Sequence, residues 1–396
     1  MRFIMESESC RLVRTDQNGS NDARHLVLFG LGVQFRDCYQ QLLPWLGREP
    51  DFLCDNAPEK WGSRFFGKKC IPPAQLCALG QDTDVVITIR KYEEVYRQLC
   101  EMGLKNIFVA CFDRSYDFVH SIKSLRIDQA AGNEQPFDSP VRGKWTLVTG
   151  AARGIGRQIA LAMAELGANI IAHSRDIAHT EEVVKACSAS GAQVIPIGAE
   201  LGNPAELEGM LDRLENDIPP VDIVFNNAGI SLSGSPAPGG ISYQDFLAHY
   251  TVNAIAPIHI SYRLIPGMIN RGYGRIINIS STIQKKPGEM AYACSKAALS
   301  KFVHDLAPSL QHTGVMISLV CPGHVRSDMG GANAPHSVES VVPGAVLGAL
   351  MDEDVNGCWF IAQDYAGLSW RAAIERAKFY YGRGGPSDGA RTLQTR

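Results

Sequence analysis

The sequence predicts an α/β protein with two domains, each built on a parallel β-sheet flanked by helices. Two short apolar runs, residues 25–30 and 145–149, each end in a glycine-rich turn that leads into a helical segment. Further short apolar runs alternate with helical segments in both halves, which is typical of doubly wound sheets. The chain has 396 residues, which is too long for one ordinary core and suits two domains.

Bulk composition excludes several classes of protein. Hydrophobic residues make up 45% of the chain, charged residues 20%, and the net charge is −3. This balance favours neither nucleic acid nor an anionic membrane as a partner. Residues 1–24 carry charges and no apolar run, so we expect a poorly ordered N-terminus rather than a signal peptide. No stretch approaches about 18 apolar residues, so no membrane span is expected.

The cysteines indicate a reducing compartment. There are eleven of them, an odd number, and no two have the C-x-x-C spacing. We therefore expect reduced thiols in the cytoplasm. Because no cluster has the spacing of metal ligands, no metal site is predicted.

The first domain is predicted from strands at 25–30, 51–55, 84–89 and 106–110. A helix begins after Gly30-Leu-Gly32, and others are expected around 93–102 and 117–125. The glycines begin a G-x-G-x-x-G pattern, but Phe35 stands at the third glycine position, which weakens the prediction of a dinucleotide site. The second strand ends in Asp55, where an acid that binds a ribose would lie.

Residues 25–125 resemble the small Rossmann-like domains appended to enzymes of sugar and surface-polysaccharide metabolism. The resemblance rests on the strand, the G-x-G turn and the D-N-x-P-x-K-W-G segment that starts at Asp55. It implies that Gly30, Gly32 and Asp55 bind a nucleotide or sugar nucleotide. The alternative is an interaction or oligomerisation module with an empty cleft. The polar residues 126–142, with Gly and Pro, are predicted to be a linker.

In the second half, a strand at 145–149 leads into the glycine-rich turn from Gly150 to Gly156 and a helix at 157–166. Such glycines let the backbone approach a pyrophosphate, and the helix N-terminus supplies free N–H donors. The next strand, 169–172, is followed by Ser174 and Arg175.

These two positions bear on the choice of coenzyme. An NAD-preferring site would place an acid at Ser174 to bind the ribose. Arg175 and Arg153 instead offer two guanidinium groups to a 2′-phosphate, which favours NADP(H). Asp176 can also reach the ribose, so NAD(H) is not excluded.

Further strands are expected at 193–197, 222–225, 274–280 and 315–320, with a Gly/Pro/Ser loop at 231–240 on the rim of the active site. Tyr292 and Lys296 lie four residues apart on a predicted helix and therefore share one face. A neighbouring ammonium favours the phenolate, so Lys296 is expected to lower the pKa of Tyr292. Such a pair can transfer a proton to or from a substrate oxygen.

Residues 144–363 resemble the compact type of short-chain dehydrogenase/reductase, most closely its carbonyl-reductase-like members. The resemblance rests on T-G-A-A-R-G-I-G at 149–156, N-N-A-G at 226–229, Asn253, I-S-S ending at Ser281, Y-x-x-x-K from Tyr292, and P-G-x-V-x-S-D-M from Pro322. We place this catalytic domain at 143–370 and a C-terminal tail at 371–396.

The resemblance implies a role for each matched residue. Tyr292 is the general acid/base, Lys296 lowers its pKa and holds the nicotinamide ribose, and Asn253 holds a water that relays protons. Ser281 polarises the substrate oxygen, although the loop before Tyr292 is short and leaves Ser280 as an alternative. The implied coenzyme-binding residues are Gly150, Arg153, Gly154, Ile155, Gly156, Ser174, Arg175, Glu200, Leu201, Asn227, Ala228, Gly229, Tyr292, Lys296, Pro322, Gly323, Val325 and Ser327.

The expected function is NADPH-dependent reduction of a small ketone or aldehyde, with a sugar-related substrate suggested by the appended domain. A generic carbonyl or 3-oxoacyl reductase with an assembly domain, and a catalytically idle nucleotide sensor, are the alternatives. Lys285 and Lys286, with His324 and Arg326, form either an anion site or a solvated loop. The resemblance also implies a homodimer or homotetramer.

Overall fold

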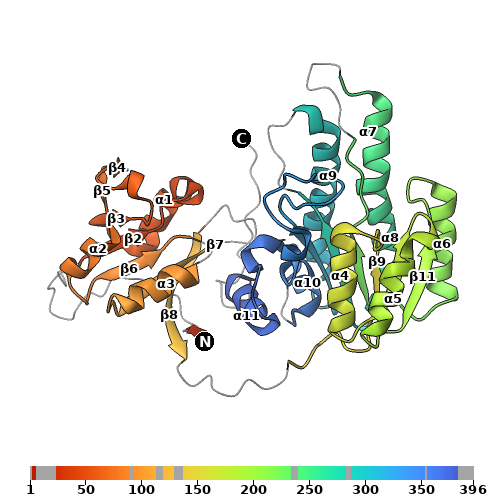
Figure 1. The fold of residues 1–396 in the computed structure, drawn as a ribbon, viewed down its shortest axis with the longest axis horizontal. Helices are drawn as coiled ribbons and strands as arrows, with labels where there is room; N and C mark the ends of the chain where they lie inside the picture. Colours follow the sequence, from red (N-terminus) through yellow and green to blue (C-terminus); the bar gives the residue numbers. More distant parts are fainter. Residues whose placement is uncertain are drawn as a thin grey trace. The chain divides into compact units, whose positions relative to one another are not determined.

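The computed structural model describes residues 2–5, 24–89, 92–112, 119–128, 137–232, 240–281, 287–352 and 355–381. The chain divides into two compact units, Met1–Gln135 with Phe379–Arg396, and Pro136–Lys378. Each unit contains one of the two β-sheets, and each is described by itself below (Figure 1). In the ranges that the structure describes, no helix is long and apolar enough to cross a membrane.

The N-terminal unit is built on an eight-stranded mixed sheet in the order β1-β8-β7-β6-β2-β3-β5-β4. Its central strands are parallel, while β8 pairs antiparallel with β7 and with β1. The strands are β1 (Arg2–Met5), β2 (Leu26–Phe29), β3 (Phe52–Cys54), β4 (Arg64–Phe65), β5 (Lys68–Ile71), β6 (Asp84–Ile87), β7 (Asn106–Phe112) and β8 (Val119–Asp128). The helices are α1 (Val33–Leu46), α2 (Pro73–Leu76) and α3 (Tyr92–Glu101), with 3-10 turns at Pro58–Lys60 and Cys77–Leu79.

Two predictions for this unit were wrong. The segment predicted as a helix at 117–125 forms strand β8 from Val119 onward. The spacing of the buried Val119 and Ile122 suits a helix, but the open edge of β7 offers a ladder of hydrogen-bond partners, and this pairing overrides local propensity. At the N-terminus, Arg2–Met5 forms β1 on the far side of β8, whereas disorder was expected.

Phe35 explains why the third glycine of the first G-x-G pattern is absent. Its buried ring lies edge-on to Tyr39 at 5.5 Å, and Tyr39 stacks in parallel on Phe66 at 4.2 Å. The third glycine position of the pattern therefore carries a side chain that packs in an aromatic cluster.

The second unit contains a seven-stranded parallel sheet in the order β11-β10-β9-β12-β13-β14-β15. Its strands are β9 (Trp145–Val148), β10 (Asn169–Ser174), β11 (Val194–Gly198), β12 (Ile223–Asn226), β13 (Gly274–Ile279), β14 (Val315–Cys321) and β15 (Trp359–Ile361). Its helices are α4 (Gly154–Glu165), α5 (Glu181–Ala189), α6 (Pro204–Asn216), α7 (Tyr243–Tyr250), α8 (Ala256–Arg271), α9 (Met290–Leu306) and α10 (Leu347–Leu350), with a π-helical turn at Thr251–Ile255 and 3-10 turns at Ile177–Thr180, Pro287–Glu289, Ala307–Leu310, Val338–Val341, Gly344–Val346 and Ala362–Tyr365.

The structure differs from the predicted boundaries of this domain. Val141, inside the predicted linker, is fully buried, and the second unit begins at Pro136. Within the predicted tail, α11 (Trp370–Tyr381) forms a helix that contains the boundary between the two units. Parts of the linker and tail, residues 129–136 and 382–396, lie outside the described residues.

The strand order places a switch point beside β9. The chain steps from β9 outward to β10 and β11, then returns to β12 on the other side of β9. In such sheets, a crevice opens at the carboxyl ends of the strands on either side of the switch point. Most of the predicted site residues lie at or just after the ends of these strands or in helices α4 and α9, while Asn253 lies in the π-helical turn between α7 and α8.

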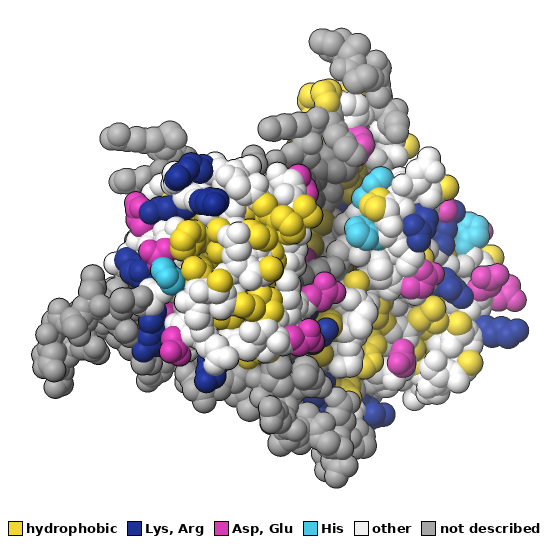
Figure 2. Space-filling view, turned by 60° about the vertical axis from the view of Figure 1, so that its left-hand side comes forward, with side chains coloured by type: hydrophobic (Ala, Val, Ile, Leu, Met, Phe, Trp, Pro, Cys, Tyr) yellow, Lys and Arg dark blue, Asp and Glu magenta, His cyan; other side chains and the backbone are white. Residues whose placement is uncertain are grey.

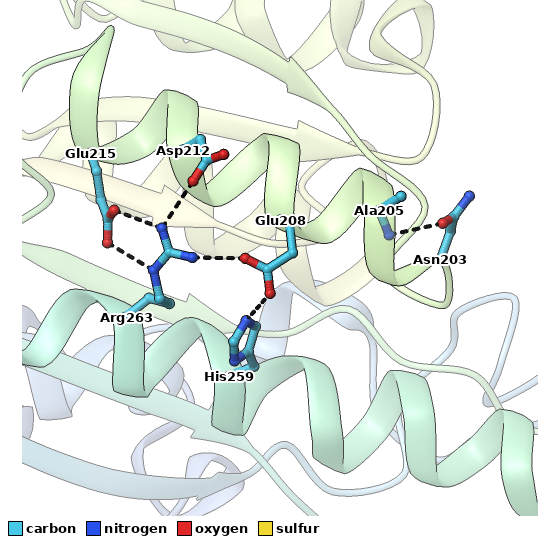
Figure 3. Close-up of polar contacts among 7 residues, drawn as sticks. All are labelled: Asn203, Ala205, Glu208, Asp212, Glu215, His259 and Arg263. Carbon is cyan, nitrogen blue, oxygen red and sulfur yellow. Dashed lines mark hydrogen bonds and ion pairs between the residues drawn. The ribbon is translucent and has the colours of Figure 1, made fainter.

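Helices α6 and α8 are joined by a cluster of charges (Figure 3). Arg263 on α8 binds both carboxylate oxygens of Glu215, at 3.1 and 2.7 Å. It also donates to Glu208 at 2.7 Å and Asp212 at 3.0 Å, and His259 contacts Glu208 at 2.6 Å. One arginine in a fork geometry thus links a row of acids one helical turn apart and orients α8 against α6.

Basic and acidic side chains are interspersed on the face shown in Figure 2. This distribution agrees with the small net charge of −3. Apolar side chains also gather on this face. Among the described residues of the N-terminal unit, Trp61 and Phe66 are exposed large apolar residues.

Candidate active site

The glycine turn after β9 leaves no room for side chains. Gly150 and Gly154 have φ angles of +66° and +57°, in the left-handed region that favours glycine. A Cβ atom on Gly156 would lie 2.2 Å from the carbonyl oxygen of Gly150. Arg153, the N-cap residue of α4, makes no side-chain cap, so the N–H groups of the first turn of α4 are available to a ligand.

His173 in β10 links this glycine turn to the segment after β11 through two hydrogen bonds. Its Nε2 lies 3.0 Å from the carbonyl oxygen of Ala199 and must carry the proton, because a carbonyl only accepts. Its Nδ1 then accepts from the Gly150 N–H at 3.2 Å. Burial lowers the pKa of His173 to about 4, so the ring is neutral at pH 7.

The segment after β12 is tied to the same turn. The Thr149 hydroxyl accepts from the backbone N–H groups of Asn227 and Ala228, at 2.9 and 3.0 Å. The Asn227 amide donates to the Thr149 carbonyl at 2.8 Å. A Cβ on Gly229 would lie 3.0 Å from Asn253 Oδ1 and 3.6 Å from Lys296 Nζ, so this glycine lets the segment pass close to both side chains.

The two arginines predicted to bind the 2′-phosphate, Arg153 and Arg175, are both exposed. Ser174 is buried at the end of β10, and the exposed Arg175 follows it. Arg153 is also exposed, and its Nη1 forms an ion pair of 2.7 Å with Asp328, in the segment after β14. Arg153 therefore extends across the glycine turn toward that segment.

Three further predicted coenzyme residues, Glu200, Leu201 and Ile155, lie just after β11 or in the first turn of α4. Leu201 has its side chain in the hydrophobic core, so only its backbone is available to an adenine ring. Glu200 accepts from the Gly202 N–H at 3.0 Å. Ile155 is partly exposed and is the second residue of α4, directly after the glycine turn.

After β14, the chain passes close to the glycine turn, because a Cβ on Gly154 would lie 3.8 Å from the Cβ of Ser327. Gly323 has a φ of +76°, and the Pro322 carbonyl accepts from Gln363 at 2.9 Å. Val325 is buried and forms a β-bridge with His336. The Ser327 hydroxyl accepts from the Gly330 N–H at 3.1 Å and retains its own proton for a ligand.

The two candidate serines point to different partners. The Ser281 side chain is hydrogen-bonded to the Tyr292 hydroxyl. The Ser280 hydroxyl instead lies 2.8 Å from that of Ser300 and is buried. The structure therefore brings Ser281, not Ser280, to the tyrosine.

Lys296 and Tyr292 share one face of α9, as their spacing predicts. Lys296 Nζ lies 5.9 Å from the centre of the Tyr292 ring and donates to the Ile279 carbonyl at 2.7 Å. Burial raises the pKa of Tyr292 to about 12, against the weaker lowering effect of Ser281. Burial lowers the pKa of Lys296 to about 8.

The pKa of Tyr292 therefore lies above its ordinary value and not below it as expected, because burial outweighs the effects that lower it. Both groups lose hydration when they are buried, and this loss disfavours the charged form of each. At neutral pH the phenol keeps its proton.

Asn253 lies in the π-helical turn between α7 and α8 and is fully buried. Its Oδ1 accepts from the Ile230 N–H at 2.8 Å, and its Nδ2 donates to the Ile230 carbonyl at 2.9 Å and to Ser295 at 3.0 Å. Ser295 in turn donates to the Tyr292 carbonyl at 2.7 Å. Since both amide protons are used, a water held by this residue needs its backbone carbonyl or the second lone pair of Oδ1.

The predicted ribose-binding acid of the N-terminal unit makes its contacts within that unit. The Asp55 carboxylate accepts from the Leu31 N–H at 2.6 Å, the Ala57 N–H at 2.9 Å and Lys60 at 2.8 Å. These contacts hold the pKa of Asp55 low against the effect of burial. The acid expected to bind a ribose thus stabilises the glycine turn of its own unit.

Only part of the predicted anion site is described. Lys285 and Lys286 lie outside the described residues. His324 contacts the Gly330 carbonyl at 2.8 Å, and Arg326 donates to the Ala334 carbonyl at 3.0 Å, so both hold their own loop. Within the described ranges, no group of three or more His, Cys, Asp and Glu side chains is placed to hold a metal ion.

Sequence reasoning missed the two histidines that support the site. His173 directly precedes the predicted coenzyme residues Ser174 and Arg175, and His249 lies one helical turn before Asn253. A polar ring at i−4 from a buried helical asparagine was a signal that both residues face the same chain segment.

Comparison with known proteins agrees with this geometry. A family model described as short chain dehydrogenase matches residues 144–337. Ketoacyl reductase HetN from Nostoc sp. is 32% identical over 228 residues, which are 54% of this chain and 79% of that protein. An NADPH-dependent aldehyde reductase-like protein from Arabidopsis thaliana is 33% identical over 225 residues, 53% of this chain and 83% of that protein.

A solved structure shares the fold of the second unit. The NADPH-bound carbonyl reductase from chicken fatty liver is 26% identical and has a TM-score of 0.50, covering 58% of this chain and all of that one. The family match lies wholly within the second unit. Through this unit, the chain belongs to the short-chain dehydrogenase/reductase family.

Proposed function

We propose that this protein reduces a ketone or aldehyde with NADPH, and that Tyr292 supplies the proton to the substrate oxygen. The observation that carries the proposal is the hydrogen bond between Ser281 and Tyr292 beside the buried Lys296. These three side chains lie at the carboxyl edge of the sheet, which the glycine turn also borders.

The residues of the crevice fit NADP(H). A turn in which Gly156 cannot carry a Cβ suits a pyrophosphate, and the uncapped N-terminus of α4 attracts its charge. Because Ser174 stands where an NAD-binding site would carry an acid, no carboxylate at that position repels the 2′-phosphate. Arg153 and Arg175 are the cations that would bind this phosphate. When bound, NADPH supplies the hydride that the carbonyl carbon receives.

Tyr292 and Ser281 handle the substrate oxygen. Two hydroxyl donors that converge on one oxygen stabilise the negative charge that develops there. Because the pKa of Tyr292 is about 12, the phenol is protonated at pH 7 and acts as the acid in the reductive direction. Its proton passes to the oxygen of the reduced carbonyl, and the buried ammonium of Lys296 favours the phenolate that remains.

Asn253 contributes only indirectly to the return of a proton to Tyr292. Its side chain holds Ile230 and Ser295, which fixes the helix turn beneath Lys296. We assign to its remaining acceptors a water that connects Lys296 with solvent, so that Tyr292 regains a proton after each turnover.

The substrate belongs to one of two classes in this proposal. The resemblance of the N-terminal unit to domains appended to enzymes of sugar metabolism favours a sugar-related carbonyl. The similarity to a protein named ketoacyl reductase favours a 3-oxoacyl substrate. In the second case, the N-terminal unit serves assembly rather than substrate binding.

A homodimer or homotetramer is also proposed. Exposed apolar side chains on α8 and its neighbour α9 support it, because Tyr262 and Ile269 are exposed and the Tyr262 ring lies 5.5 Å from that of Phe302. Covering such a surface with a second copy removes apolar area from water. Sedimentation equilibrium measures the assembly directly.

The test is a panel of probe carbonyls with NADPH and with NADH: 5-keto-D-gluconate, D-fructose, ethyl acetoacetate and 4-nitrobenzaldehyde. We expect the wild type to consume NADPH with at least one probe, and Tyr292→Phe to consume none while binding NADPH equally well. Tyr243→Phe, at an exposed site on α7, is the matched control and should retain activity. NADPH binding without turnover of any probe would favour the idle nucleotide sensor.

A further inference from the structure

The segment that follows β12 runs beside helix α7 and the adjoining π-helical turn, and two of their side chains bind it. Asn253 binds both backbone groups of Ile230, as described above. His249 binds Leu232, two residues further along the segment, because the Leu232 N–H donates to its Nε2 at 3.0 Å. We propose that His249 is a positioning residue that sets Leu232, at the start of the active-site rim, relative to Tyr292. This inference rests on the reductase function proposed above.

The spacing of the two anchors follows from backbone geometry. Residues four apart on a helix rise about 6 Å along the axis, and two residues of extended chain cover about 6.6 Å. His249 and Asn253 are therefore in register with Leu232 and Ile230. Because two points of attachment fix both place and direction, His249 adds an orientation that Asn253 does not provide.

The hydrogen bonds of His249 define its tautomer. Nδ1 lies 2.6 Å from the Asp245 carbonyl, which only accepts, so Nδ1 carries the proton. Nε2 of the neutral ring is then an acceptor and matches the Leu232 N–H. The ring is fully buried, and both of its nitrogens are satisfied.

The same ring contacts the proposed proton donor. The ring centres of His249 and Tyr292 are 6.5 Å apart at an angle of 77°, an edge-to-face arrangement. The segment therefore begins at Gly229, beside Lys296. It ends at Leu232, whose N–H is bound by His249, and the His249 ring packs on Tyr292.

The Leu232 side chain is half-exposed, although its backbone is fixed. It offers an apolar surface near the catalytic tyrosine at a position that His249 sets. We therefore assign Leu232 to the wall that contacts the carbon frame of the substrate. Loss of the anchor should weaken substrate binding more than it slows the chemical step.

The first measurement is amide hydrogen exchange, which needs no substrate. In His249→Phe, which keeps the ring volume but removes both nitrogens, the Leu232 amide should exchange at least tenfold faster than in the wild type. The Ile230 amide, held by Asn253, should keep its protection. His249→Gln, which retains an acceptor, should restore part of the protection at Leu232. Equal exchange at Leu232 in all three proteins would overturn the anchor.

The second measurement is steady-state kinetics with NADPH and the probe carbonyls. We expect His249→Phe to raise KM about tenfold, to change kcat less than threefold and to leave the Kd for NADPH unchanged. If His249→Phe does not fold, Leu232→Pro deletes the same hydrogen bond, and Leu232→Ala, which loses the side chain but keeps the N–H, is its control; a larger rise in KM for Leu232→Pro than for Leu232→Ala is expected. An unchanged KM, or a loss confined to kcat, would refute the positioning role.

The two proposals fail in different ways. A wild type that reduces no probe contradicts the reductase function, while the exchange measurement still decides whether His249 anchors Leu232. A wild type that reduces a probe, together with an unaltered KM in both variants, contradicts the inference alone.

Discussion

A hydrogen bond joins the side chains of Ser281 and Tyr292 across the loop between β13 and α9. Ser280, one residue earlier, is turned the other way and pairs with Ser300 on α9. Since successive residues at the end of a strand face opposite sides, only one of the two serines can reach the tyrosine.

The two serines should therefore respond differently to alanine. Ser281→Ala removes a donor to the developing negative charge, and we expect kcat to fall by about 10²–10³. Ser280→Ala should keep kcat within about twofold and lower the free energy of unfolding by about 1 kcal/mol, because it removes a buried hydrogen bond. Kinetics and urea unfolding measure the two effects. The reverse pattern would assign the catalytic role to Ser280.

Gly156→Ala should abolish coenzyme binding. Its new Cβ would lie 2.2 Å from the Gly150 carbonyl and 2.4 Å from the Asn227 amide, so the turn must change shape. We expect the Kd for NADPH, measured by fluorescence titration, to rise at least about 100-fold. A turn that tolerated the methyl group would leave the Kd unchanged and contradict this account.

Gly209→Ala on α6 is the matched control, because a Cβ there meets no atom within 4 Å. Alanine is the better helix former, so the free energy of unfolding of this variant should be about 0.5–1 kcal/mol higher than that of the wild type. Its Kd for NADPH should be unchanged.

Arg175→Ala should weaken NADPH much more than NADH. A charge-assisted hydrogen bond contributes about 1.5–3 kcal/mol, which corresponds to a rise of roughly 10- to 150-fold in the Kd for NADPH. The Kd for NADH, which lacks the 2′-phosphate, should change less than about twofold. Arg213→Ala, at an exposed arginine on α6, controls for the loss of one positive charge. Equal losses for both coenzymes would exclude the contact with the 2′-phosphate.

His173 should make the protein sensitive to acid. Its pKa is lowered from 6.5 to about 4 in the folded state, so the unfolded chain binds the additional proton between these values. The stability contributed by the neutral ring is present above pH 6.5 and is lost as the pH falls toward 4. The full shift corresponds to about 3 kcal/mol.

Urea unfolding at a series of pH values tests this dependence. Between pH 6.5 and 4, the free energy of unfolding of the wild type should fall more steeply than that of His173→Gln, which lacks the titrating ring. His179→Gln, at an exposed histidine, should follow the wild type. Parallel curves for the wild type and His173→Gln would show that His173 does not cause the loss.

Much of the architecture could be predicted from local patterns. The strands β2, β3, β6 and β7, and those from β9 to β14, follow apolar runs bounded by turn residues, because a strand buried on both faces must be apolar along its length. The glycine turn at Gly150 and the pair Tyr292 and Lys296 are equally local, since a left-handed backbone and a helical spacing need only a few neighbouring residues.

Contacts between distant segments were decided by the tertiary structure alone. Strand β8 exists because β7 offers an edge, and the Asp55 carboxylate accepts hydrogen bonds from Lys60 and from the Leu31 N–H. The pKa of Tyr292 is raised because the folded chain buries its side chain. The spacing of Tyr292 and Lys296 in the sequence does not show how deeply the tyrosine is buried.

The sequence by itself determined the family, the glycine turn and the helical spacing of Tyr292 and Lys296. The tertiary structure decided that Ser281 reaches Tyr292 and that His173 and His249 hold the segments around them. The physical reason is that backbone conformation and helical spacing are set by neighbours in the chain. Burial and hydrogen-bond partners, in contrast, depend on residues brought together only by folding.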